Sequence, residues 1–158
     1  MILVLVCFFS CKNNENKLAE TITSSKSDTS LLKNRAVLEK AINTNDTNSY
    51  NAIVNQHMLH VLQKDLLYYV LRMAYRNKYS RAYFHVFIIF TYLTPNGPKK
   101  ELEQMDANSR NFALYHLLKS HEMGCSDAKY YINATFDNPK TIPSSQYYLS
   151  ELNKEYLR

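Results

Sequence analysis

The sequence predicts an all-α fold. Its 158 residues include only two glycines and four prolines, too few for the many tight turns of a β sandwich. Apolar residues recur instead at the three- and four-residue spacing of amphipathic helices, and polar or proline-containing stretches separate these runs. The length suits one domain of ordinary size, and a content of 46% hydrophobic residues is enough for a packed core.

An apolar run from Ile2 to Phe9 opens the chain. It is far shorter than the roughly 20 residues of a membrane-spanning helix, but its length is typical of the apolar part of a signal peptide, about 7–15 residues. Ser10 and Cys11 follow, and the whole stretch resembles a bacterial lipoprotein signal. The resemblance implies that residues 1–10 are removed. It also implies that a lipid on the sulfur of Cys11 anchors the chain to a membrane of the cell envelope, facing the periplasm.

The segment departs from the lipoprotein pattern at its start, because no basic residue precedes the apolar run. A start codon upstream of Met1 would explain the difference. A buried N-terminal strand is the alternative, but the run lacks the polar alternation of a half-buried strand. Residues 11–30 are mainly polar, so we expect the lipidated cysteine to be followed by a flexible tether. A helical domain is then expected over residues 31–158.

The first three helices are predicted from apolar spacing. The first covers residues 31–42 and ends in the polar stretch NTNDTNS. The second begins at Tyr50, runs toward Leu59 and is expected to end before Lys64. The third covers residues 65–75, and Asn77 is expected to end it as a left-handed C-cap.

The most apolar segment, SRAYFHVFIIFTYL, covers residues 80–93. It is apolar on nearly every side, so we expect a helix in the middle of the core, with Ser80 as its N-cap. Its composition would also suit a strand, but its 14 residues are long for one strand. The next stretch, TPNGPKK, is predicted to be a loop because proline and glycine oppose helix continuation.

Two further helices are predicted on either side of Gly124, and one at the end of the chain. The first of them covers about residues 109–123 and ends at Gly124, whose freedom at positive φ suits a helix end. Ser126 or Asp127 is expected to cap the next helix, which runs to the stretch DNPKTIPSS. The terminal helix is expected over residues 146–157.

The segment ALYHLLKSHEMGCSDAKYYI resembles the helix-turn-helix unit of Sel1-like repeats, relatives of the tetratricopeptide family. The positions that carry the resemblance are Ala113, Tyr115, Lys119, Ser120, Gly124, Ala128 and Ile132. LYYVLRMAYRNKYSRAYFHVF repeats part of this pattern, and LEKAINTNDTNSYNAIV repeats it more weakly. The resemblance implies antiparallel helix pairs stacked as a short right-handed solenoid. An irregular helical bundle is the alternative.

Sel1-like proteins commonly act as adaptors, so the resemblance implies a non-catalytic protein–protein interaction module. Tyrosine and arginine are favoured at such interfaces. The residues expected to contact the unknown partner are Tyr68, Arg72, Tyr75, Arg76, Tyr79, Tyr83 and Tyr130. Neutralising a toxin, as an immunity protein, would be one form of this function. The net charge of +5 is scattered, and without a basic stripe no nucleic-acid partner is expected.

The sequence contains no recognisable catalytic, cofactor or metal motif. His57 and His60 are three residues apart, but a zinc site usually needs at least three protein ligands. Cys125 would be the only thiol of the mature chain, and packing at a helix start is the favoured interpretation. The alternative is an envelope hydrolase that uses His121 and Cys125. We expect no metal, no cofactor and no small-molecule substrate.

Overall fold

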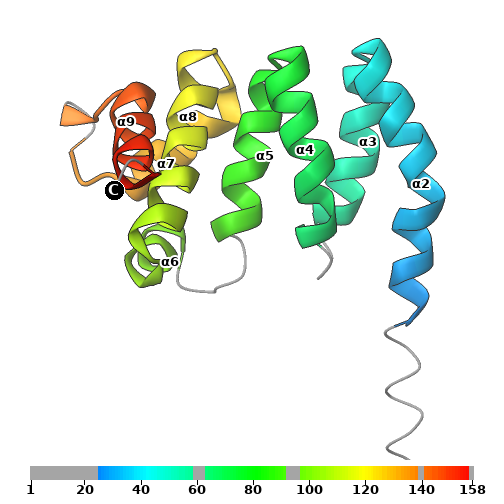
Figure 1. Ribbon diagram of the computed structural model, residues 1–158, viewed down its shortest axis with the longest axis horizontal. Helices are drawn as coiled ribbons and strands as arrows, with labels where there is room; N and C mark the ends of the chain where they lie inside the picture. The colour runs from blue at the N-terminus through cyan, green and yellow to red at the C-terminus, as the bar shows by residue number, and fades with distance from the viewer. Residues whose placement is uncertain (1–24, 59–62, 92–96, 139–140, 157–158) are drawn as a thin grey trace, which may run out of the picture. The chain divides into compact units, whose positions relative to one another are not determined.

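The computed structural model describes residues 25–58, 63–91, 97–138 and 141–156. These residues form eight α-helices and no strand, which confirms the all-α prediction (Figure 1). The chain divides into two compact units, Met1–Lys33 and Asn34–Arg158. Of the first unit the structure describes only the helical backbone from Ser25 onward. The predicted signal and Cys11 lie outside the described residues.

The helices follow the order in which the sequence predicts them, with one addition. They are α2 (Ser25–Thr44), α3 (Thr47–Met58), α4 (Gln63–Asn77), α5 (Ser80–Thr91), α6 (Pro98–Gln104), α7 (Ala107–Glu122), α8 (Ser126–Thr135) and α9 (Ser145–Tyr156). The first helix therefore begins before Leu31, the predicted start. The other predicted helices begin and end within a few residues of their expected bounds.

Helix α6 lies where the sequence predicts a loop, so the loop prediction is wrong from Pro98 onward. Gly97 precedes the helix with φ 84° and ψ 165°, and Pro98 is its first residue. Proline suits this position because the first N–H groups of a helix have no partner within it and the fixed φ matches the helix. The proline therefore starts a helix here.

The turns between helices use residues with positive φ. Gly124, at φ 85°, ends α7 as predicted. Lys78, at φ 52°, takes the left-handed position that was predicted for Asn77. The side chain of Asn77 is engaged elsewhere, since its Nδ2 donates to the carbonyl oxygen of Ile42 at 2.8 Å. A tertiary contact has therefore moved the turn by one residue.

The predicted N-caps are each displaced by one or two residues. Ser80 is the first residue of α5 and so lies one position after the cap. Cys125 occupies the cap position of α8 and makes no side-chain capping bond, so that Ser126 and Asp127 fall in the first turn. Asp106 does cap α7, because its carboxylate accepts from the backbone N–H of Ser109 at 2.9 Å.

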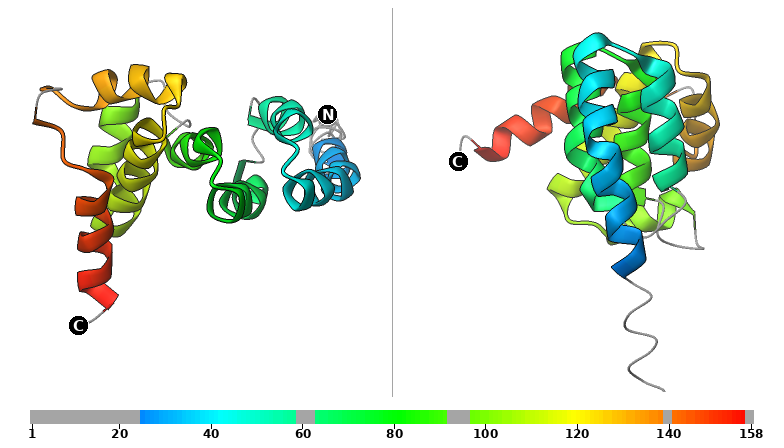
Figure 2. Two further views of the ribbon diagram at one scale, coloured as in Figure 1. Left: turned by 90° about the horizontal axis from the view of Figure 1, so that it is seen from above. Right: turned by 90° about the vertical axis from the view of Figure 1, so that its right-hand side faces the viewer.

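Helix α5 lies at the centre of the core, as predicted. Nine of its twelve residues are buried. It contacts α4, α6, α7 and α8, and it lies between α3 and α8 in Figure 1 and in the left view of Figure 2. Each of the pairs α4–α5 and α7–α8 also packs together. Burial on every side explains why the segment shows little amphipathic pattern.

Small residues line the contacts between these helices. Ala82, Ala113 and Ala128 are fully buried, and so is Ser120, whose Oγ donates to the carbonyl oxygen of Ser80 at 2.8 Å. A small side chain lets two helix backbones approach closely, and the Ser120 hydrogen bond fixes α7 to the start of α5. These are the positions that carry the repeat-like pattern, so the pattern has a packing function whatever its origin.

Enlarging Ala128 should destabilise the fold. The substitution Ala128→Leu adds three carbons at a fully buried site, and overpacking of this kind costs about 1–3 kcal/mol of unfolding free energy. Urea denaturation measures the loss. Ala134→Leu is the matched control because Ala134 is exposed on the same helix, and its effect should stay within about 0.5 kcal/mol. Equal losses in the two variants would contradict tight packing at Ala128.

Helix α9 packs against α7, and a carboxylate at the end of α7 fixes its start. Glu122 accepts from the backbone N–H of Ser145 at 2.8 Å and from the Ser145 hydroxyl at 2.6 Å. A carboxylate is favoured at a helix N-terminus, where free N–H groups and the helix dipole both attract it. The terminal helix is therefore part of the folded unit.

Candidate functional site

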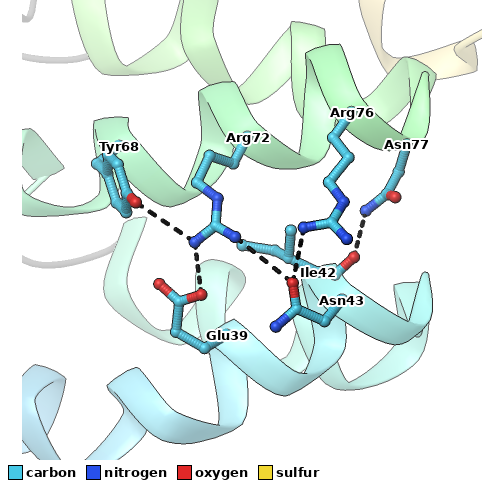
Figure 3. A network of polar contacts seen from close by, with 7 residues as sticks. All are labelled: Glu39, Ile42, Asn43, Tyr68, Arg72, Arg76 and Asn77. Carbon is cyan, nitrogen blue, oxygen red and sulfur yellow. Dashed lines mark hydrogen bonds and ion pairs between the residues drawn. The ribbon is translucent and has the colours of Figure 1, made fainter.

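The residues predicted to bind a partner lie in separate parts of the second unit. Tyr68, Arg72 and Arg76 lie on α4 where it meets α2 (Figure 3). Tyr75 and Tyr83 lie against α7, and Tyr79 lies against α3. Tyr130 lies on α8 and borders a groove. The structure therefore does not bring these residues together on a single face.

The contact between α2 and α4 is a polar network (Figure 3). Arg72 forms an ion pair with Glu39, and its guanidinium also donates to the Tyr68 hydroxyl at 3.4 Å and to Asn43 Oδ1 at 3.5 Å. Arg76 donates to the same Asn43 oxygen at 2.8 Å. These arginines already have partners within the chain, so their main effect is to hold α4 against α2.

Tyr75 and Tyr83 surround a buried histidine. His116 Nδ1 lies 2.7 Å from the carbonyl oxygen of Phe112, and its Nε2 lies 2.9 Å from the Tyr75 hydroxyl. Because a carbonyl can only accept, Nδ1 carries the proton and Nε2 accepts from Tyr75. Burial lowers the pKa of His116 to about 4. Tyr83 is only 2% exposed, which places it in the core and not on a surface that a partner could reach.

Tyr79 joins α3 to the turn between α4 and α5. Its hydroxyl accepts from Asn51 Nδ2 at 2.8 Å, and its ring meets the ring of Tyr50 edge-on at 5.9 Å. Both contacts are internal to the fold. Tyr79 therefore packs α3 against the following pair of helices.

A groove of about 430 Å³ lies between α3, α5 and α8. This volume falls within the range of ligand-binding clefts, roughly 300–1,000 Å³. Its lining residues are Asn55, Met58, Arg81, Phe84, His85, Ile88, Asp127, Tyr130 and Tyr131. Of the residues predicted to bind a partner, Tyr130 alone is part of this lining, and it is 72% exposed.

The groove combines an apolar wall with a balanced pair of charges. The Tyr131 ring meets the ring of Phe84 at 5.1 Å, and Met58 and Ile88 extend the apolar surface. Arg81 forms an ion pair of 2.9 Å with Asp127, and both side chains are about 40% exposed. Since the two charges offset each other, the groove carries a polar edge without a net charge.

His85 contributes a polar atom to the apolar lining. The residue is buried, and its Nδ1 lies 3.1 Å from the hydroxyl of Tyr50. Burial lowers the pKa of His85 to about 3, and the positive charge of Arg81 makes a smaller contribution to this shift. The imidazole is therefore neutral at physiological pH.

Sequence reasoning missed all of this groove except Tyr130. Its residues come from three helices that are distant in the sequence, so no local motif marks them. One signal was present in the most apolar segment. Helical spacing places a charged residue, Arg81, on the same side of that helix as Phe84, His85 and Ile88. A charged residue in such a segment indicates either a buried ion pair or a surface that remains open.

The residues considered for catalysis or metal binding do not form a constellation. Cys125 is buried at the start of α8, whereas His121 is exposed on α7. His57 is buried with its Nε2 3.2 Å from Asn34 Nδ2, and His60 lies outside the described residues. Within the described ranges, no three His, Cys, Asp or Glu side chains are close enough to hold a metal ion.

Comparisons with protein-family models, with curated proteins and with solved structures find no match. Among the helices of the described ranges, none is both long and apolar enough to cross a membrane.

Proposed function

We propose that the chain is a lipid-anchored protein of the bacterial cell envelope that acts as a non-catalytic protein–protein interaction module. The lipid anchor rests on the resemblance of the first eleven residues to a lipoprotein signal. The observation that carries the interaction role is the groove between α3, α5 and α8, with its apolar wall and the exposed Tyr130 in its lining. A groove of this kind suits a segment of another protein, since aromatic side chains supply contact area at a low cost in conformational entropy.

The stacking of helix pairs into a short solenoid is part of the proposal. Three observations support it: α4–α5 and α7–α8 pack as pairs, α5 packs against α7 and α8 and is joined to α3 by the Tyr50–His85 hydrogen bond, and small residues line the contacts. Helix-pair repeats expose extended surfaces of several helices. The groove, which draws on α3 and on one helix from each of the two packed pairs, fits that arrangement.

Affinity purification after crosslinking in the source cells tests the interaction. We expect the full chain to retain one stoichiometric protein, and Tyr130→Ala to lose it. Tyr147→Ala is the matched control, because Tyr147 is also an exposed tyrosine, 50% exposed on α9, and does not line the groove. Arg76→Ala should also retain the protein, because Arg76 is directed at Asn43. Loss in Arg76→Ala with retention in Tyr130→Ala would move the interface to α4.

The membrane anchor is tested separately. In bacteria fed labelled palmitate, we expect label on the wild-type chain and none on Cys11→Ala. Cys125→Ala should keep the label, since Cys125 is buried in the folded domain. Label that persists on Cys11→Ala would overturn the lipid anchor and leave the interaction proposal untouched.

A further inference from the structure

The hydrogen bond between Tyr50 and His85 decides where the His85 proton lies. Tyr50 is fully buried, and among the described residues its hydroxyl has a hydrogen bond only to His85 Nδ1, at 3.1 Å. A buried hydroxyl hydrogen without an acceptor is unfavourable, because it has given up its hydrogen bond to water and gained none in return. The arrangement that avoids this cost has the Tyr50 O–H donating to Nδ1. Nδ1 is then an acceptor and carries no proton.

The proton of the neutral ring is therefore on Nε2. A neutral imidazole carries one N–H, and Nδ1 is already excluded. Burial keeps the ring neutral, as its lowered pKa of about 3 indicates. The Tyr50–His85 pair thus converts the second nitrogen of His85 into a fixed hydrogen-bond donor.

Nε2 keeps at most a small exposed surface, because His85 is only 4% exposed. No hydrogen bond of the described residues uses it. Among the described residues, four side-chain nitrogen or oxygen atoms are buried and have no hydrogen-bond partner. They are Asn51 Oδ1, Arg81 Nε, Glu101 Oε2 and Thr135 Oγ1. His85 Nε2 is absent from this set, so it is not fully enclosed. Because His85 lines the groove, we place this N–H at the groove surface.

The groove surface therefore offers hydrogen-bond donors without a net charge. Arg81 has five N–H groups and uses one nitrogen for Asp127. A carboxylate near Arg81 would also lie near Asp127, and the like charges would repel each other. A neutral acceptor avoids this repulsion. The backbone carbonyl of a peptide is such an acceptor, and Asp127 can accept from a peptide N–H in turn.

We infer that the groove binds an uncharged, apolar peptide segment of the partner protein. One backbone carbonyl of the segment accepts a hydrogen bond from His85 Nε2–H. An apolar side chain of the segment packs against Phe84 and Ile88. This inference rests on the proposed function and specifies the chemistry of the occupant. Tyr50 is a positioning residue in this scheme, because it acts only through the ring of His85.

Nitrogen-15 NMR of the wild-type protein tests the tautomer without any substitution. The expected spectrum shows a proton on Nε2 of His85 and none on Nδ1. In Tyr50→Phe the donor to Nδ1 is lost, so we expect the share of the Nδ1–H tautomer to increase. A wild-type His85 that carries its proton on Nδ1 would overturn the inference.

Binding is tested with a library of apolar tetrapeptides that are acetylated and amidated, measured by fluorescence anisotropy on the folded chain. Blocked peptides should bind, and His85→Phe should weaken the tightest of them about tenfold, the effect of one hydrogen bond of about 1.4 kcal/mol. Tyr147→Ala should not change their affinity. Circular dichroism shows whether His85→Phe is folded. If it is not, Tyr50→Phe replaces it, with a smaller expected loss.

The same library with free carboxylate ends separates this inference from the proposed function. Tighter binding of the free acids would overturn the neutral occupant and leave the groove as a binding site. If no peptide binds while Tyr130→Ala still loses the cellular partner, the peptide inference fails and the proposed function stands. If Tyr130→Ala keeps the partner, the groove itself is excluded as the interface.

Discussion

Lowering the pH from 7.5 to 5 should reduce the free energy of unfolding by about 4 kcal/mol through two buried histidines. His85 and His116 have pKa values of about 3 and about 4 in the folded chain, where burial opposes their charged forms, against an ordinary value of 6.5. At pH 5 the unfolded chain is protonated at both sites and the folded chain at almost neither. Acid therefore favours the unfolded state.

The size of this effect follows from the distance between the pH and the ordinary pKa. Each histidine costs about 1.4 kcal/mol per pH unit below 6.5, or about 2 kcal/mol at pH 5. The loss begins as the pH falls through 6.5 and levels off only below the folded pKa values. Asp46 and Asp106 do not interfere at pH 5, because hydrogen bonds lower their pKa values below 3.8.

Urea denaturation at several pH values between 7.5 and 5 measures the slope of the unfolding free energy against pH. The variant His116→Leu should remove about half of it, although it also destabilises the fold at pH 7.5 because Tyr75 loses its acceptor. The slope is therefore the quantity to compare, and not the stability itself. His121→Leu is the control, since His121 is exposed on the same helix. If the unfolding free energy of His116→Leu depended on pH as strongly as that of the wild type, this would contradict a buried, neutral His116.

The sequence was sufficient to predict the helices but not the contacts that adjust their ends. Helical spacing and the position of Gly124 are local properties, and both predictions hold. Asn77 fails as a C-cap because its amide binds the carbonyl of Ile42, a residue 35 positions earlier. Pro98 illustrates a different limit: proline excludes the middle of a helix but suits its first turn, and the sequence does not say which applies.

The candidate site could be predicted only in part, because residue type does not determine exposure. Tyr83 and Tyr130 are chemically identical, yet one is buried between α5 and α7 and the other is the most exposed tyrosine with a described environment. The difference depends on which side of each helix meets a neighbour. The chemistry of arginine predicts that Arg72 and Arg76 bind a partner, and the structure shows that both already have partners on α2. The groove arises only when three distant helices come together.

Phe87→Ala should cost about 3–5 kcal/mol of unfolding free energy, as expected for removal of a fully buried aromatic ring. Phe87 lies near the middle of α5 with no exposed surface, and its ring meets those of Phe84 at 6.4 Å and Tyr131 at 5.8 Å. The substitution leaves a cavity between α5 and α8. Because Phe84 and Tyr131 also line the groove, the same cavity should weaken peptide binding.

Tyr147→Ala is the control for loss of an aromatic ring, because half of its surface is already exposed, and its effect should be near 0.5 kcal/mol. A loss as large as that of Phe87→Ala would contradict the central position of α5.

The shape of the urea transition adds a second readout. In a stack of helix pairs each pair depends on its neighbours, so weakening α5 should broaden the transition as the pairs on either side unfold separately. A bundle with one shared core would unfold in a single, equally steep transition at lower urea. Phe87→Ala therefore tests the stability of the core and the proposed solenoid in one experiment.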